Sequence, residues 1–376
     1  MSLPLARLVS ALERIAPPEL AESWDNVGLL VDPRAPGAEL EVSRVLLAID
    51  ATPAVVDEAL ATRTDCLVAY HPPLFEAKRR YQRSSDTLLF AAASAPFAVY
   101  SPHTALDAAK DGLNDWLAHC VGPGEVEPLV TARPGAAREL KLVVFVPEDH
   151  ADALRDALAE AGAGVIGNYS RCSFNTQGVG TFFGEEGANP EVGEQGRFER
   201  APELRLEMVC PERVVPAAAR AIARHHPYEE PAWELYPLSA KPLVGAGRAR
   251  RVQLAEPRPL GELVSELKAN LGLPHLRLAA SATQLSGAPV RSVSVAAGSG
   301  SGAFDGGPPS DLYVTGEMRH HDVLAHLARG ASVVLCEHSS SERGFLSALR
   351  ERLLRETDTE VSVTIARADT EPLTVV

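Results

Sequence analysis

The chain has 376 residues, 45% of them hydrophobic and 23% charged, which is typical of a soluble globular protein with two or three domains. Its formal net charge of −14 argues against nucleic-acid binding, because nucleic-acid-binding surfaces are basic. The five scattered cysteines predict free thiols in a reducing compartment, and the lack of a long apolar run predicts a cytoplasmic protein that contacts no membrane.

Residues 1 to 125 alternate strand-like and helical patterns. A turn at residues 24–28 leads into the first predicted strand, residues 29–31. The further predicted strands are 44–50, 66–71 and 97–100, and the predicted helices are 53–61 and 112–120. This alternation predicts βαβ units around a largely parallel sheet that is covered on both faces.

The next stretch differs in character. Residues 122–135 are rich in Pro and Gly, so we expect a break between domains. Residues 139–237 then show the order strand, helix, strand, strand, helix, strand, which is typical of a ferredoxin-like fold. The predicted elements are 139–147, 150–162, 180–183, 203–209, 214–225 and 232–237. Residues 184–200, rich in Gly and Glu, are expected to form a flexible hairpin tip.

From about residue 242 the α/β pattern resumes. A helix is predicted at residues 260–271, and strands are predicted at 290–297, 311–316, 332–336 and 360–365. We therefore expect one α/β domain, residues 1–125 and 242–376, that is split in the sequence by an inserted α+β domain at 139–237.

Polar side chains follow the predicted strands of the split domain at the point where each strand ends. They are Asp50, His71, His103 with Asp107, Glu317, and His338. In open α/β sheets, ligands bind outside the carboxyl ends of the strands, so these residues are expected to share one crevice. Imidazole and carboxylate groups together are suited to holding a divalent metal.

The run from Ser332 to Leu346 carries the clearest signal. An apolar strand ends at His338, and Glu342 follows four residues later, where a helix is expected to begin. Residues four apart share one helix face, so both side chains could bind one metal. The same residues also fit a capping box, in which Ser339 and Glu342 bond the helix N-terminus.

Single residues of this set have structural alternatives. His71 alone would fit a turn, Asp50 would fit the N-cap of the following helix, and Asp107 would fit a helix entry. The metal hypothesis therefore depends on their joint position at one edge. Residues 320–322, 225–230 and 298–302 are weaker candidates, and the last of these lacks the lysine of a phosphate-binding loop.

Several motifs in the right order resemble the NIF-three-like dinuclear-metal family, whose members are often labelled GTP cyclohydrolase I type 2 homologues. The motifs are Glu22–Val31 (ESWDNVGLLV), Tyr70–Phe75 (YHPPLF), His103–Asp107 (HTALD) with Gly112–Leu117 (GLNDWL), Gly316–Asp322 (GEMRHHD) and His338–Leu346 (HSSSERGFL). Residues 139–237 resemble the PII/CutA-like insert of longer bacterial members.

The resemblance implies two similar α/β lobes with mixed, largely parallel sheets, a two-metal site between them and a homohexamer. Matching the family's motifs to this sequence implies the metal ligands His71, Asp107, His338 and Glu342. Asp107 and Glu342 would bridge the two metal ions. Tyr70 stands where many bacterial members have histidine, so it could bind the metal, hydrogen-bond beside it or leave a position open. Mixed ligation of this kind suits Zn, Mn or Fe, one or two ions per subunit.

Two functions remain open from the sequence. The first is a metal-dependent hydrolase acting on an unidentified small molecule, with GTP-type C–N hydrolysis suggested by the family label and with His103, Glu317 or His321 as acid–base or supporting groups. The second is a regulatory or scaffold oligomer whose metal is structural and whose PII-like insert senses a small molecule.

Overall fold

A computed structural model describes residues 2–35, 38–76, 79–82, 84–94, 97–132, 139–239 and 242–374. The chain divides into two compact units, residues 1–133 with 242–376 and residues 134–241. No helix within the described ranges is long and apolar enough to cross a membrane.

The first unit contains a five-stranded sheet in the order β17-β4-β5-β6-β2. Neighbouring strands are parallel except β2, which runs antiparallel to β6. The strands are β2 (Gly28–Val31), β4 (Arg44–Ala48), β5 (Cys66–Ala69), β6 (Ala98–Ser101) and β17 (Ser362–Ile365). The five short strands lie close to their predicted positions, because continuous apolar runs are characteristic of strands that are buried on both faces.

Helices cover both faces of this sheet. On one face, Val45 and Leu47 of β4 pack in one core with residues of α1 (Leu5–Ile15) and α11 (Phe345–Glu356). On the other face, Leu46 and Ala48 pack with residues of α2 (Pro53–Ala61) and α3 (Thr87–Ser94). This division follows from the two-residue period of a strand. It also explains why β4 is apolar at successive positions.

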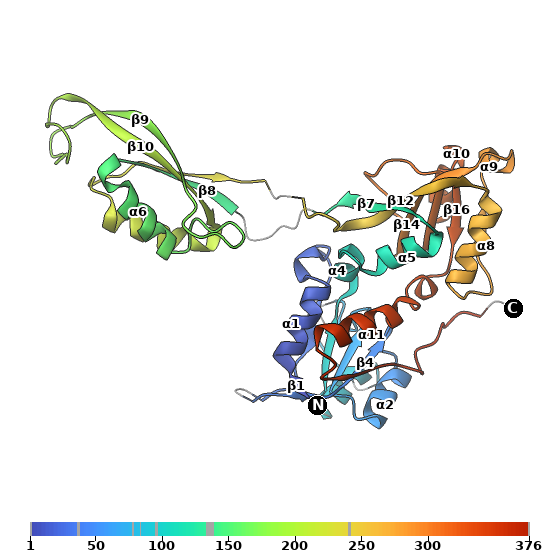
Figure 1. The fold of residues 1–376 in the computed structure, drawn as a ribbon. Coiled ribbons are helices and arrows are strands. Elements are labelled where there is room, and N and C mark those ends of the chain that lie inside the picture. The colour runs from blue at the N-terminus through green and yellow to red at the C-terminus, as the bar shows by residue number, and fades with distance from the viewer. Residues whose placement is uncertain are drawn as a thin grey trace. The chain divides into compact units, whose positions relative to one another are not determined.

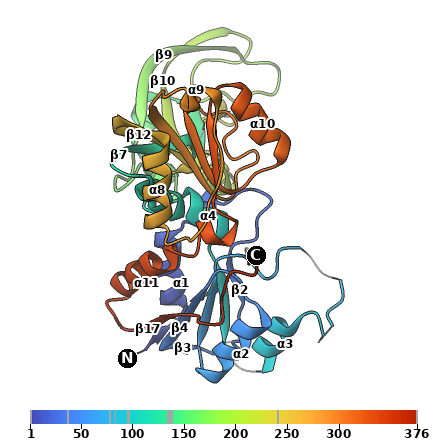
Figure 2. The ribbon, with the colours of Figure 1, turned by 90° about the vertical axis from the view of Figure 1, so that its right-hand side faces the viewer.

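A six-stranded sheet in the same unit has the order β13-β16-β15-β14-β12-β7. Strands β14, β15 and β16 are parallel, whereas β13, β12 and β7 are antiparallel to their neighbours. The strands are β7 (Gly124–Thr131), β12 (Gly247–Arg258), β13 (Arg277–Ala279), β14 (Val290–Ser299), β15 (Leu312–Glu317) and β16 (Ser332–Leu335). Figure 2 shows both sheets of this unit, with α4 (His103–Ala108) where they meet.

The remaining elements of the first unit are short or cover the second sheet. Residues of α5 (Leu113–Val121) and α8 (Leu260–Asn270) pack in one core with β12, β14 and β15. The others are β1 (Leu3–Pro4), which pairs with β3 (Glu41–Val42), η1 (Pro18–Leu20), α9 (Ala282–Leu285), α10 (His320–Ala328) and η3 (Ser339–Ser341).

The predicted break at residues 122–135 contains the boundary between the two units, after Arg133, but most of its described part forms strand β7. β7 pairs with β12, a long strand that the sequence patterns also did not reveal. β7 is the last strand of its sheet, and an edge strand can accommodate Pro128 where a central strand would lose a hydrogen bond. A Cβ atom at Gly124 would lie 2.4 Å from the Gln253 carbonyl oxygen, so glycine here permits close strand pairing.

The second unit has one antiparallel sheet in the order β11-β8-β10-β9 (Figure 1). Its elements are β8 (Glu139–Val146), α6 (Glu148–Glu160), β9 (Phe174–Phe183), β10 (Phe198–Pro211), η2 (Glu212–Val214), α7 (Val215–His225) and β11 (Trp233–Pro237). Residues of α6 and α7 share one core with β8 and β10. The hairpin of β9 and β10 is longer than predicted. The sequence did not reveal its outer part, because the polar and glycine residues there do not alternate clearly with apolar residues.

Candidate metal centre

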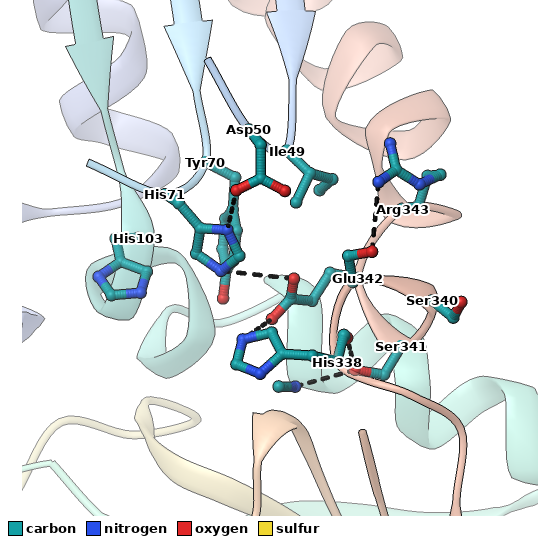
Figure 3. A network of polar contacts seen from close by, with 12 residues as sticks. Ile49, Asp50, Tyr70, His71, His103, His338, Ser340, Ser341, Glu342 and Arg343 are labelled. Carbon is teal, nitrogen blue, oxygen red and sulfur yellow. Dashed lines mark hydrogen bonds and ion pairs between the residues drawn. The ribbon is translucent and has the colours of Figure 1, made fainter. Parts of the chain in front are cut away.

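Residues from the two sheets of the first unit meet at one point. His71 follows β5 of the five-stranded sheet, and His338 follows β16 of the six-stranded sheet. Glu342 lies just beyond η3, between the two imidazoles (Figure 3). One ligand atom from each of these three residues lies within 4.8 Å of the other two, which makes the group a candidate metal site.

Glu342 is the centre of this group. Its Oε2 atom lies 3.5 Å from His71 Nε2, and its Oε1 atom lies 3.5 Å from His338 Nε2. The residue is only 1% exposed, and Oε2 has no hydrogen-bond partner among the described residues. A buried carboxylate oxygen is costly without a partner, so its position favours an adjacent positive charge, either a metal ion or the protonated imidazole of His71.

Carboxylates hold the histidines of the site in a common orientation. Asp50 Oδ1 lies 2.9 Å from His71 Nδ1, and Glu317 Oε1 lies 3.0 Å from His338 Nδ1. A carboxylate on Nδ1 fixes the tautomer and leaves Nε2 free as a ligand, which is the usual arrangement around histidine ligands of metals. Glu317, a candidate acid–base residue, therefore contacts His338 and supports its orientation.

A third imidazole of the same kind lies beside the cluster. Asp25 Oδ1 is 2.7 Å from His103 Nδ1, and the His103 ring centroid is 5.4 Å from that of His71. Asp25 also accepts a hydrogen bond from the Thr104 backbone N–H at 3.1 Å. These contacts hold the first turn of α4 against the loop before β2. His103 thus lies at the edge of the candidate metal site, with its Nδ1 held by Asp25.

Tyr70 and Asp107 form a separate buried pair next to the cluster. The Tyr70 hydroxyl donates a 2.6 Å hydrogen bond to Asp107 Oδ1. Burial, followed by the charges of Asp107 and Glu342, raises the pKa of Tyr70 well above its usual value. Burial also raises the pKa of Asp107 to about 6, although the bond from Tyr70 acts in the opposite direction. In this structure Tyr70 is therefore a neutral donor to Asp107.

The run that carries His338 and Glu342 is not an α-helix. β16 ends at Leu335, η3 is a short 3-10 turn over Ser339–Ser341, and α11 begins only at Phe345. The predicted shared helix face and the capping box are therefore wrong. The Ser339 hydroxyl bonds Glu371 of the C-terminal segment, and Glu342 is directed to the imidazoles.

The alternative role of Asp50, as the N-cap of the following helix, is wrong. Thr52, not Asp50, caps α2, because its hydroxyl accepts a hydrogen bond from the Val55 N–H. Asp50 is free to hold His71 instead. The sequence did not predict that Asp50 and Asp25 orient His71 and His103. The only signal in the sequence was that each aspartate lies shortly before a predicted strand or helix.

The C-terminal segment joins both halves of the site. The Asp369 carboxylate accepts a 2.6 Å hydrogen bond from the Ile49 N–H, next to Asp50, and forms a 2.7 Å ion pair with Arg343, next to Glu342. Glu371 accepts hydrogen bonds from two serines of η3. No strand or helix pattern marks residues 366–374, so these supporting contacts could not be found from the sequence.

His321 is the one predicted site residue that the described contacts do not connect to the cluster. It is exposed in the first turn of α10, and its ring lies 5.5 Å from that of His320. The weaker candidate His226 ends α7 in the second unit and has its Nε2 2.8 Å from the Phe145 carbonyl oxygen. That contact is a structural role for His226.

Comparison with known proteins agrees with this architecture. The sequence profile of the Duf34/NIF3 (NGG1p interacting factor 3) family matches residues 3–372. The chain belongs to the DUF34/NIF3 family. A "GTP cyclohydrolase 1 type 2 homolog" of Mycobacterium tuberculosis is 36% identical over 392 residues, covering 99% of this DUF34/NIF3 chain and 97% of the relative. "NIF3-like protein 1" of Rattus norvegicus is 33% identical over 377 residues, covering 100% of this chain and 93% of the relative.

Solved structures show the same fold. A Bacillus cereus protein related to NIF3 matches 100% of this DUF34/NIF3 chain and 99% of its own, with a TM-score of 0.67 and 30% sequence identity. A Staphylococcus aureus protein matches over the same shares with a TM-score of 0.79 and 22% identity, which is evidence for the fold alone. The mixed α/β architecture expected from the sequence is therefore confirmed.

The residues of this DUF34/NIF3 chain suit a divalent metal. In a tetrahedral site with bonds of about 2.0–2.1 Å, neighbouring ligand atoms lie about 3.3 Å apart. His71 Nε2 lies 3.5 Å from Oε2 of Glu342 and His338 Nε2 lies 3.5 Å from Oε1, so each imidazole is close to that spacing from a different oxygen of the carboxylate. Two imidazoles and a carboxylate also form the donor set that Zn, Mn and Fe accept. The buried, unpartnered Oε2 of Glu342 completes the fit.

Gly298 is a steric requirement of the site, and its replacement gives a sharp test. Its φ is +60°, and a Cβ atom there would lie 2.6 Å from Glu342 Oε1 and 3.1 Å from His338 Nε2. We expect Gly298→Ala to displace the carboxylate and weaken metal binding at least tenfold in a metal titration. The positive φ would also cost about 1–2 kcal/mol of stability.

Gly302→Ala is the matched control. Its φ is +85°, but the nearest atom to an added Cβ would be Asp305 Oδ2 at 3.8 Å. This control is expected to carry a similar backbone cost and to keep its metal affinity. Equal metal affinities for the two variants would show that Glu342 does not depend on the space at Gly298.

Proposed function

We propose that this protein is a metal-dependent hydrolase whose divalent metal, Zn, Mn or Fe, binds to His71, His338 and Glu342. The observation that carries the proposal is the buried Glu342 carboxylate, which has an unpartnered oxygen and lies between two imidazoles that carboxylates orient. Asp107, paired with Tyr70, is the ligand proposed for a second ion. Hydrolysis of the GTP cyclohydrolase type is one candidate reaction, suggested by the names of the relatives.

The chain's own residues have distinct roles in this proposal. A bound metal would supply Lewis-acid polarisation of the bond that is cleaved. Asp50 and Glu317 keep each Nε2 directed into the site. His103, held by Asp25 through Nδ1, is placed to take up or release a proton at Nε2.

Exposed aromatic rings beside the site support the binding of a substrate. Trp24 is 59% exposed and Phe75 is 48% exposed, and their ring centroids lie 5.9 Å apart. Both rings also lie edge-on to His103, at 6.1 and 6.3 Å. Large aromatic groups left in water next to a polar cluster are characteristic of a binding surface. They would suit a substrate with a planar ring, such as a purine.

The experiment that tests the proposal compares metal-free and metal-reloaded protein. Both forms are incubated with GTP, with formate release as the readout, and with a panel of amide, ester and phosphoester substrates. We expect activity in the reloaded form only, and its loss in His338→Ala. Full activity without metal, or no activity on any of these substrates with a full site, would contradict the hydrolase.

Metal binding is also expected to depend on pH. Burial lowers the pKa of His71, but its hydrogen bond to Asp50 and the charge of Glu342 outweigh burial and raise the pKa to about 10. His71 is therefore protonated in the metal-free chain at neutral pH, and a metal must displace that proton. The apparent affinity is expected to rise about tenfold per pH unit between pH 6.5 and 8, because the raised pKa lies above this window.

Proton release measures this dependence directly. Calorimetry at pH 7.5 in two buffers of different ionisation enthalpy is expected to show about one proton released per metal ion. Below pH 6 a second proton is expected if Asp107 is a ligand, since its pKa is about 6. Metal binding without proton release at pH 7.5 would show that His71 is already neutral in the metal-free chain, and would contradict its raised pKa.

The second candidate function is a regulatory or scaffold oligomer. The observation that favours it is the separate second unit, which has its own sheet and core. We propose that this unit is an inserted ferredoxin-like, PII/CutA-like domain, that the chain forms a homohexamer and that the protein is cytoplasmic. Deleting residues 139–237 separates the two functions, because an enzyme would retain its chemistry whereas a sensor would lose its response.

A further inference from the structure

The proposed ligands of the candidate metal centre do not all converge. Within the described ranges, the one group of at least three His, Cys, Asp and Glu side chains with ligand atoms within 4.8 Å of one another is His71, His338 and Glu342. Asp107, the ligand proposed for a second ion, is not in this group. The three converging residues can therefore hold one ion without a contribution from Asp107.

Asp107 is engaged by a tyrosine instead. The Tyr70 hydroxyl donates a hydrogen bond of 2.6 Å to Asp107 Oδ1. Hydrogen bonds to a carboxylate are short and strong, because the acceptor is charged. This bond draws on the same negative charge that would attract a metal ion. The phenol and an ion therefore compete for Asp107.

The surroundings of Tyr70 hold its phenol in this position. Tyr70 is 3% exposed, and its ring centroid lies 4.9 Å from that of His71 and 5.5 Å from that of His103. Its N–H donates to the Ala48 carbonyl oxygen at 2.8 Å, and its carbonyl oxygen accepts a 2.8 Å hydrogen bond from the Ser101 hydroxyl. Turning the ring away from Asp107 would disturb its packing against both imidazoles.

The backbone of Asp107 is also anchored. Asp107 lies near the end of α4, and its backbone carbonyl oxygen accepts a 3.1 Å hydrogen bond from Asn114 Nδ2. Oδ1 of the same asparagine accepts a 2.8 Å hydrogen bond from the Ala297 N–H of β14. A movement of Asp107 toward an ion would strain these bonds, which favours its pairing with Tyr70.

We propose that Tyr70 competes with the second metal ion, so that this chain binds one divalent ion tightly at His71, His338 and Glu342 and a second ion at Asp107 only weakly. The proposal rests on the metal centre of the proposed function and departs from the two-metal site that the family resemblance implies. The physical reason is that a phenol O–H donates to Asp107 at the position where an imidazole would offer a lone pair to an ion.

Zinc titration of the full chain tests the proposal. Calorimetry is expected to show two steps, with the second at least about tenfold weaker than the first. Elemental analysis after desalting is expected to find one zinc ion per chain. Two zinc ions retained by the unmodified chain would overturn the proposal and leave the hydrolase intact. No retained zinc would contradict the metal centre itself, so the two failures are distinguishable.

Tyr70→Phe separates competition from ligation. The variant removes the hydroxyl and keeps the packing of the ring. We expect the second zinc ion to bind at least about tenfold more tightly, because Asp107 loses a hydrogen bond of the charged kind. The first step is expected to change little. A weaker second step would mean that the phenol is a ligand, and an unchanged second step would mean that it does not compete; either result refutes the proposal.

Tyr100→Phe is the matched control. Tyr100 is 1% exposed and lies in β6 of the same sheet, so this variant also removes the hydroxyl of a buried tyrosine. Both zinc steps are expected to match those of the unmodified chain. An equal tightening of the second step in both variants would show that the effect is not specific to Tyr70 and would overturn the proposal.

Tyr70→His supplies the missing lone pair. This variant is expected to retain about two zinc ions per chain after desalting, because an imidazole replaces the competing donor beside Asp107. One zinc ion in a folded Tyr70→His variant would contradict the proposal. If the buried imidazole prevents folding, the change of the second step in Tyr70→Phe decides the question alone.

Discussion

Glu342→Gln is expected to remove most of the stabilisation that a divalent metal gives the intact chain. The substitution keeps the size of the side chain and removes the buried charge between His71 and His338. An amide is a far weaker ligand than a carboxylate for Zn, Mn or Fe, so the affinity is expected to fall by at least about a hundredfold.

Thermal unfolding with and without metal measures this change. At a metal concentration about a thousand times the dissociation constant, binding stabilises a protein by about 4 kcal/mol. A hundredfold weaker variant under the same conditions would retain about 1.4 kcal/mol. The metal-induced rise in melting temperature is therefore expected to fall to about a third of its original size in Glu342→Gln.

Two further variants control this experiment. Glu351→Gln lies on the exposed side of α11 and is expected to behave like the unmodified chain. Glu317→Gln keeps all three proposed ligands and loses only the carboxylate that orients His338, so its affinity is expected to fall about 10–100-fold. A full metal response in Glu342→Gln would remove this residue from the ligand set.

The sequence predicted the location of the candidate site better than its local structure. The strands before His71 and His338 were visible because β5 and β16 are continuous apolar runs. The expectation that the polar residues share one edge was wrong, because His71 follows a strand of the five-stranded sheet and His338 follows a strand of the six-stranded sheet. The local geometry after His338 was not visible, because a 3-10 turn and an α-helical N-terminus can begin with the same serine-rich sequence.

Most of the features that could not be predicted from the sequence are contacts between segments far apart in the chain. Asp25, Asp50 and Asp369 each orient a part of the site from a segment without periodicity. The pairing of β7 with β12 joins two segments that are separated in the sequence by the second unit. Neither local propensity nor spacing carries information about such pairings, which depend on the completed sheets.

Arg250→Met is expected to lower the free energy of unfolding of the first unit by about 3–5 kcal/mol, which is the usual effect of breaking a buried ion pair. Arg250 is fully buried in β12 and binds both carboxylate oxygens of Asp115 in α5. Its guanidinium also donates to the backbone carbonyls of Ala108 and Ala109, directly after Asp107. One side chain thus joins the second sheet to the segment that carries a proposed metal ligand.

The size of this effect follows from what methionine leaves behind. Methionine fills a similar volume but offers no donor, so the Asp115 carboxylate and several carbonyls would remain buried without partners.

Urea unfolding followed by tryptophan fluorescence reports on this region, because Trp116 is next to Asp115. Arg251→Met is the control, since the one ion pair of Arg251 within the described ranges is a 3.9 Å contact with the exposed Glu127, and its loss is expected to cost less than about 1 kcal/mol. Similar midpoints for the two variants would mean that Asp115 and the carbonyls find other partners, and that Arg250 does not hold the two parts together.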